Sequence, residues 1–211
     1  MKLDEAFHLG IIPALAGFRW NGEELLDRLR AGAQGPLLAK LDEQSRRLND
    51  RNPETVKLVL LAERLLAKLE LAPAPRPQTP DGYRAWAKQV ADAGMNATAA
   101  NAHETAAYFL GRALGNLLMT LALRVLTDDL LGAAPEHPFL VAQRDALAAG
   151  EAQALRLFET AAQNPAHGDA VRKVLDEDRA ILATLATAAP REAVFRHLNA
   201  SIPGLEAALR E

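Results

Sequence analysis

Residues 97–131 read ATAANAHETAAYFLGRALGNLLMTLALRVLTDDLL, without a proline. The stretch is apolar on nearly every side of a helix, which at about 1.5 Å per residue would cross a small domain. Such a helix must be surrounded by other helices or by lipid. Arg112, Asn116 and Arg124 interrupt the roughly 20 apolar residues that a membrane span needs. The stretch therefore predicts a long, buried central helix in an all-α, single-domain, multi-helix bundle.

The overall composition favours the same fold class. Of the 211 residues 49% are hydrophobic, which is enough for one full core. Alanine and leucine, which favour helices, far outnumber valine and isoleucine, so we expect no sheet. The sequence contains no cysteine, which excludes disulfides, thiolate catalysis and zinc–thiolate sites.

The charge pattern indicates neither nucleic-acid binding nor export. Twenty-four basic and 27 acidic residues give a net charge of -3 without a basic face. Asp4 and Glu5 stand where a signal peptide would carry positive charge, and Gly10 and Pro13 break the apolar run. We therefore expect a soluble cytoplasmic protein that binds no membrane. Its high alanine and arginine content is typical of a bacterial source.

A proline-rich connector predicts the organisation of the chain. Residues 73–80 separate the N-terminal helices, 1–72, from residues 81–211, which hold the central and C-terminal helices, and we expect both parts to pack as one domain. Capping and proline signals predict helices over 36–49, 53–71, from Pro80 to about Gly94, 138–162 and 168–188. The helix over 138–162 is expected to be amphipathic and to be either interrupted or only weakened at Gly150.

The N-terminal segment leaves two arrangements open. Gly10 and Pro13 predict either one kinked helix or two short ones over residues 3–20. Asn21 is positioned to cap a separate helix that begins at Gly22 and ends near Gly32.

Two stripes follow the central helix at the helical period. One consists of small residues that let another backbone approach closely. Its members are Ala100, Ala107, Gly111, Gly115 and Ala122. The other is polar and includes Thr105, Arg112 and Asn116, with Tyr108 beside them. Because an unpaired buried polar group costs roughly 1–3 kcal/mol, the polar stripe is part of a structural network, open to solvent, or the lining of a pocket.

The pocket interpretation defines a candidate ligand site. Its residues are Thr105, Tyr108, Arg112, Asn116 and Glu63. Arg112 would bind a carboxylate or phosphate. Glu63 lies on the apolar side of the helix expected over 53–71, where it either reaches water at the edge or meets Arg112 inside; the edge position is favoured.

No recognised catalytic motif is present. A di-metal bundle requires two Glu-x-x-His pairs, and the sequence offers one, Glu5-Ala-Phe-His8, with Glu63 and Glu104 as further carboxylates. Serine-hydrolase turns and phosphate-binding loops are missing. We therefore favour a non-enzymatic bundle that works through a protein partner or self-association. The alternatives are a small-anion or metal-dependent bundle and, more remotely, an enzyme using Glu5, His8 and Glu104. The sequence identifies no cofactor.

Overall fold

The computed structural model describes residues 1–49, 63–71, 80–165 and 176. All regular secondary structure in these ranges is helical, which confirms the all-α class. The long helices are α1 (Leu3–Arg30), α2 (Gly35–Asn49), α4 (Pro80–Thr98), α5 (Ala102–Leu131) and α6 (Pro138–Ala162). Residues 63–68 add a short helical stretch.

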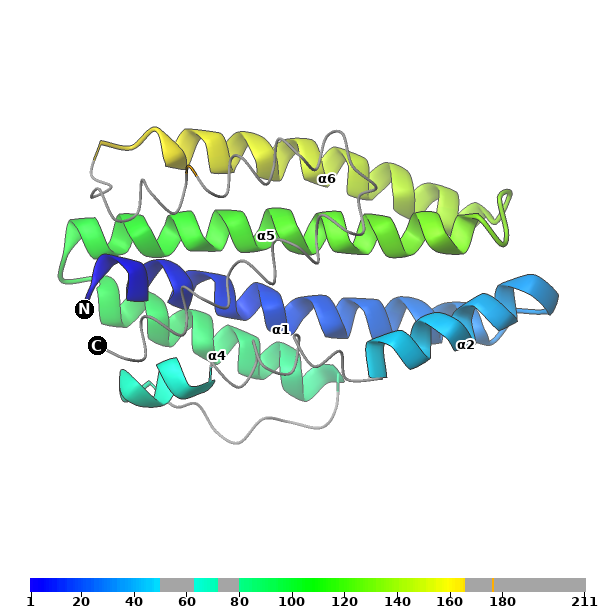
Figure 1. Ribbon diagram of the computed structural model, residues 1–211, viewed down its shortest axis with the longest axis horizontal. Coiled ribbons are helices and arrows are strands. Elements are labelled where there is room, and N and C mark those ends of the chain that lie inside the picture. The colour runs from blue at the N-terminus through cyan, green and yellow to red at the C-terminus, as the bar shows by residue number, and fades with distance from the viewer. Residues whose placement is uncertain (50–62, 72–79, 166–175, 177–211) are drawn as a thin grey trace.

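Helix α5 is the central element, as predicted, and contacts α1, α2, α4 and α6. Figure 1 shows α6 along one side of α5, with α1 and α4 on the other and α2 beside the far end of α1. Helices α1 and α5 run in the same direction, because Gly111 meets Phe7 at one end of the pair and Gly22 approaches Leu126 at the other. The neighbours α4 and α6 run antiparallel to α5.

The small stripe of α5 packs against the backbone of α1. A Cβ added at Gly111 would lie 2.0 Å from the carbonyl oxygen of Phe7, and one added at Gly10 would lie 2.2 Å from the carbonyl oxygen of Tyr108. One turn further along, a Cβ on Gly115 would lie 2.8 Å from that of Ala14. Only hydrogen in place of a side chain allows such a contact, so these glycines fix the α1–α5 pair.

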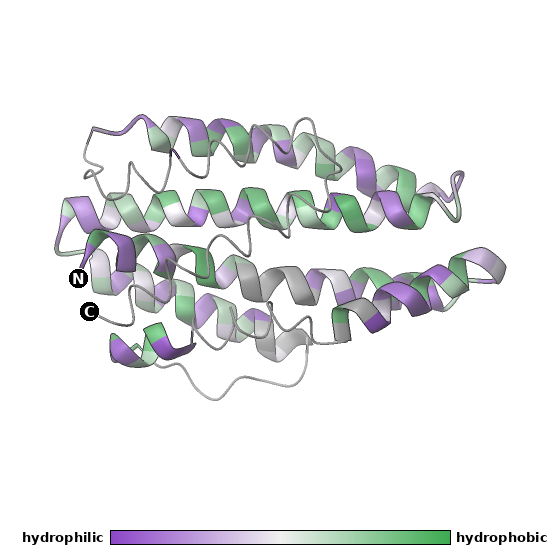
Figure 2. Cartoon of the chain, in the orientation of Figure 1, coloured by the Kyte–Doolittle hydropathy of each residue, from purple (hydrophilic) through white to green (hydrophobic). Residues whose placement is uncertain are grey.

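Two apolar clusters fill the bundle on either side of this crossing. The first joins the N-terminal halves of α1 and α5 to the C-terminal half of α6, around residues such as Phe7, Leu114 and Phe158. The second joins the other halves to α2, around residues such as Leu26, Leu41 and Leu130. Helix α5 contributes to both clusters, and Figure 2 shows hydrophobic residues along much of it, with hydrophilic ones between them.

The predicted start of the central helix is wrong by five residues. The chain leaves α4 at Thr98, and α5 begins at Ala102 instead of at residue 97. Asn101 has extended backbone geometry, and its side-chain oxygen accepts hydrogen bonds from the backbone nitrogens of His103 and Glu104. These hydrogen bonds make Asn101 the N-cap at which α5 starts. The residues just before it belong to α4, which continues past its predicted end at Gly94 to Thr98.

The predicted break at Asn21 is also wrong. Helix α1 is continuous from Leu3 to Arg30, with Pro13 inside it. The Asn21 side chain does not cap a new helix; its Nδ2 lies 3.4 Å from Met119 Sδ on α5. The local sequence around Asn21 favours a helix boundary, but packing against α5 keeps this segment helical.

Helix α5 is long and apolar enough to cross a membrane by length and composition alone. Half of its most apolar stretch is buried inside the protein. The cytoplasmic location remains a prediction.

Other predicted boundaries are confirmed where the structure describes them. Helix α2 covers 35–49, α4 begins at Pro80, and the turn at 132–137 leads into Pro138 of α6. The connector over 73–79, most of the helix over 53–71 and the helix over 168–188 lie outside the described residues.

We expect Gly111→Ala to lower the free energy of unfolding by at least about 3 kcal/mol or to prevent folding, because the added methyl overlaps the Phe7 carbonyl. Urea unfolding followed by circular dichroism measures the effect.

Gly150→Ala is the matched control. Gly150 lies within α6, and a Cβ there meets Thr120 Cγ2 at an ordinary 3.7 Å. Since alanine is the better helix former, this variant should be stabilised by about 0.5–1 kcal/mol. Equal stability of the two variants would contradict a glycine-dependent crossing.

Candidate functional site

Tyr108 is the most buried member of the predicted site. Its side chain is 2% exposed, and its hydroxyl donates a 2.8 Å hydrogen bond to the carbonyl oxygen of Ala91 on α4. Burial raises the pKa of the phenol, and the Arg112 guanidinium opposes that rise through its charge and a side-chain hydrogen bond. Tyr108 therefore joins α4 to α5 and holds Arg112.

Arg112 is the positively charged residue of this cluster. It is half-buried, and no ion pair to it occurs among the residues that the structure describes. Asp92 on α4 is close enough to act on Tyr108 through its charge. The ring of Phe109, 50% exposed, lies edge-on to Tyr108 with centroids 5.5 Å apart. The cluster thus presents an aromatic ring and a guanidinium three positions apart on α5, where side chains are neighbours on a helix surface.

The remaining predicted residues lie at different places around this cluster. The Thr105 hydroxyl donates to the carbonyl oxygen of Thr98 at 2.8 Å and closes the α4–α5 turn. Asn116 is exposed, one turn beyond Arg112. Glu63 is half-buried on the short helical stretch, which meets α1 through Lys68. Whether these five residues bind a ligand remains a prediction.

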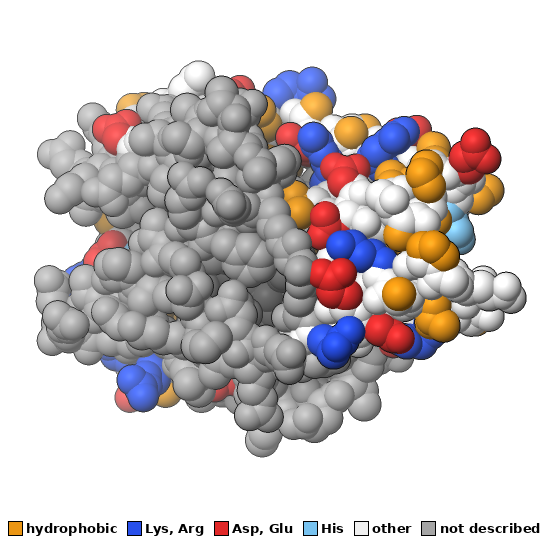
Figure 3. Space-filling model, turned by 45° about the vertical axis from the view of Figure 1, so that its right-hand side comes forward, with side chains coloured by type: hydrophobic (Ala, Val, Ile, Leu, Met, Phe, Trp, Pro, Cys, Tyr) orange, Lys and Arg blue, Asp and Glu red, His pale blue; other side chains and the backbone are white. Residues whose placement is uncertain are grey.

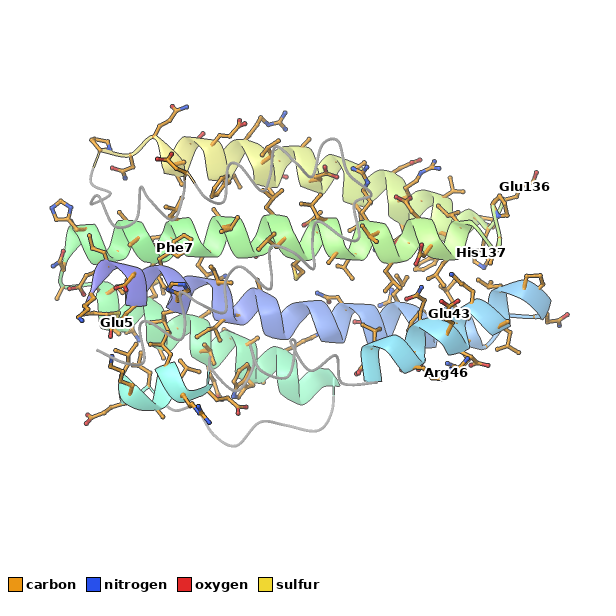
Figure 4. The ribbon with its side chains drawn as sticks, in the orientation of Figure 1. Glu5, Phe7, Glu43, Arg46, Glu136 and His137 are labelled. Carbon is orange, nitrogen blue, oxygen red and sulfur yellow. The ribbon has the colours of Figure 1, made fainter. Side chains whose placement is uncertain are left out.

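A second group of polar side chains lies at the start of α1, where Figure 4 labels Glu5. Glu5 is 5% exposed; it accepts from the Lys2 backbone nitrogen at 2.9 Å and pairs with Lys68 at 3.1 Å. Burial works against ionisation of Glu5, but these donors and charges outweigh it and lower the pKa. The 4% exposed His8 donates from Nδ1 to the Asp4 carbonyl oxygen at 2.6 Å, and its burial lowers the pKa.

This group holds the residues of the remote metal hypothesis without forming a metal site. Glu104 pairs with the amino group of Met1 at 3.1 Å. In the described ranges, no three His, Cys, Asp or Glu side chains are arranged to hold a metal ion. Instead, Glu5 links α1 to the short helical stretch over 63–68 through Lys68. The hydrogen bond of His8 to Asp4 lies within the first turns of α1.

The outer face of α6, away from α5, is a feature that the amphipathic prediction missed. Residues 146–155 carry one charge, Glu151, and it pairs inward with Arg124 of α5. The exposed side of this ten-residue stretch therefore carries no charge. The outer face consists of Ala142, Arg144, Asp145, Ala146, Ala148, Ala149, Ala152, Gln153, Leu155, Arg156, Leu157, Glu159 and Thr160, all exposed.

The two leucines make this face unusual. Leu155 is 37% exposed and Leu157 is 59% exposed. The scarcity of charge over ten consecutive residues was visible in the sequence and is the signal that would have found the face.

The end of the bundle that holds the α1–α2 and α5–α6 turns has a mixed surface. On this side Figure 3 shows acidic and basic side chains interspersed with hydrophobic ones, and the pairs Arg30–Asp42 and Lys40–Glu43 belong to α1 and α2. At the turn before α6, Figure 4 shows Glu136 and His137 at the tip. The Nδ1 of His137 is buried and has no hydrogen-bond partner in the described part of the chain.

Comparison with protein-family models, curated proteins and solved structures finds no match to this chain.

We expect His8 to make stability depend on pH below about 6.5, its ordinary pKa. The folded state keeps the imidazole neutral, so the unfolded chain binds more protons and the free energy of unfolding falls as the pH drops. Glu5, whose pKa is lowered from 4.5, contributes only in the lower range, where its stabilisation is lost as the pH falls below about 4.5.

Urea unfolding at pH 7.5, 6.5 and 5.5 measures the His8 contribution. His8→Gln keeps a side-chain donor but does not titrate, so its loss of stability over this range should be smaller than that of the wild type. The same slope in both proteins would show that His8 is not responsible.

Proposed function

We propose that this chain is a non-enzymatic helical bundle that acts through protein contacts, with the outer face of α6 as its contact surface. The observation that carries the proposal is the exposure of Leu155 and Leu157 beside a run of exposed alanines. Burial of apolar surface drives most protein association, at about 25 cal/mol per Å² removed from water. A helix face of this kind suits another amphipathic helix, whose side chains pack between the alanines.

A photo-crosslinking amino acid in place of Leu157 tests this proposal in cells that express the full chain at its normal level. Illumination should give discrete adducts of higher mass. The same amino acid in place of the exposed Glu136, at the tip of the α5–α6 turn, is the control and should give none. Absence of adducts at Leu157, or the same adducts at both positions, would contradict the proposal.

A second candidate function is the binding of a small organic anion at Arg112. The observation that favours it is the half-buried guanidinium, whose side-chain partner in the described ranges is the phenol of Tyr108 rather than a carboxylate. A carboxylate or phosphate would complete the pairing, since charge-assisted hydrogen bonds to arginine are strong and directional. The half-exposed Phe109 ring beside it would contact an apolar part of the ligand.

Calorimetric titration with benzoate and with inorganic phosphate tests the anion site. Either anion is expected to bind the wild type, and Arg112→Ala should abolish binding while the circular dichroism spectrum stays unchanged. Asn116→Ala, an exposed position on the same side of α5, should weaken binding less. If Arg112→Ala unfolds the protein, or if it binds as well as the wild type, the arginine does not hold an anion.

A further inference from the structure

The charges on the outer face of α6 follow a symmetric pattern. Asp145, Ala149, Ala152 and Arg156 are all exposed and are spaced by four, three and four residues, so they form one line along the helix. Reading this line from either end gives a charge, two alanines and the opposite charge. Leu155 and Ala148, also exposed, lie next to the line on one and the same flank.

Such a line is complementary to its own reversed copy. When two α6 helices lie antiparallel across a twofold axis between Gly150 and Glu151, Asp145 of each chain faces Arg156 of the other. Ala149 then faces Ala152, and Leu155 lies beside Ala148 of the other chain on the same flank of the line. A twofold interface uses the same patch on both chains, which is the property this line has.

The middle of the line permits close packing. Alanine side chains at both central positions let the helix axes approach to about 8 Å, the lower end of the usual range. Glu151 does not interfere, because it pairs with Arg124 on the inner side of α6. At the outer ends Arg144 contacts Asp145 of its own chain at 3.0 Å, next to the position that Arg156 of the second copy would occupy.

We infer that the partner of the outer face of α6 is a second copy of this chain, bound antiparallel through Asp145–Arg156 ion pairs that flank an alanine contact. The inference rests on the proposed function and names its partner. It predicts that the purified full chain has twice the mass of the 22.8 kDa monomer.

Charge reversal tests the pairing by sedimentation or light scattering of the full chain at low salt. Asp145→Arg places like charges together at two symmetric sites and should raise the dissociation constant about tenfold. Arg156→Asp should do the same. The double variant Asp145→Arg/Arg156→Asp restores opposite charges and should dimerise within about threefold of the wild type. Glu136→Arg changes the net charge as Asp145→Arg does, and should leave the dimer intact.

Engineered cysteines test the antiparallel direction, since the natural chain has none. Ala142 and Thr160 are 18 positions apart on α6, about 27 Å along the helix. In the antiparallel dimer, Ala142→Cys of one chain lies near Thr160→Cys of the other, so a mixture of the two variants should form a disulfide under mild oxidation while neither variant alone does. A disulfide in either single variant would overturn the inference.

The outcomes separate this inference from the proposed function. A monomeric wild type, or a double charge variant that fails to recover dimerisation, overturns the second-copy inference. If Leu157 nevertheless crosslinks to a different protein in cells, the contact surface stands and its partner is another chain.

Discussion

The bundle depends on one contact between backbones. At Gly10 and Gly111 the helices α1 and α5 approach until a single methyl group would overlap a carbonyl oxygen of the other helix. This contact sets the separation and the parallel direction of the pair. Helix α4 then packs against both helices, where a Cβ on Gly94 would meet the rings and branches of Tyr108 and Leu9. Helices α2 and α6 close the remaining apolar sides of α5.

The sequence predicted the central helix and its small stripe because both follow from a 3.6-residue period that local chemistry sets. The sequence could not predict that the backbone of α1 approaches this small stripe. A glycine such as Gly10 also weakens a helix, and that role explained its presence equally well. The continuity of α1 through Asn21 is a tertiary effect, decided by a contact with Met119 almost a hundred positions away. The start of α5 was predictable in principle, because Asn101 and Glu104 form a capping pattern.

The polar stripe of α5 was also predicted only in part. Periodicity placed Thr105, Tyr108 and Arg112 on related sides of one helix, but their hydrogen-bond partners are backbone carbonyls of α4 and each other. Every residue has a backbone carbonyl oxygen, so the sequence does not reveal which carbonyl accepts a hydrogen bond from another helix. Sequence alone therefore cannot distinguish a hydroxyl that is paired within the protein from one that binds a ligand. The described contacts account for the two hydroxyls and leave the Arg112 charge as the distinctive feature of the cluster.

The two glycines of the α1–α5 contact are synthesised at different times. Gly10 emerges from the ribosome about a hundred residues before Gly111, and at roughly 5–20 residues per second this interval lasts about 5–20 seconds. During that time the glycine side of α1 lacks the helix that fits it. Helices α2 and α4, which are made earlier than α5 and also contact α1, are then the native partners within reach. The central helix of the finished protein is thus added after α1, α2 and α4, and α6, which covers its other side, is made later still.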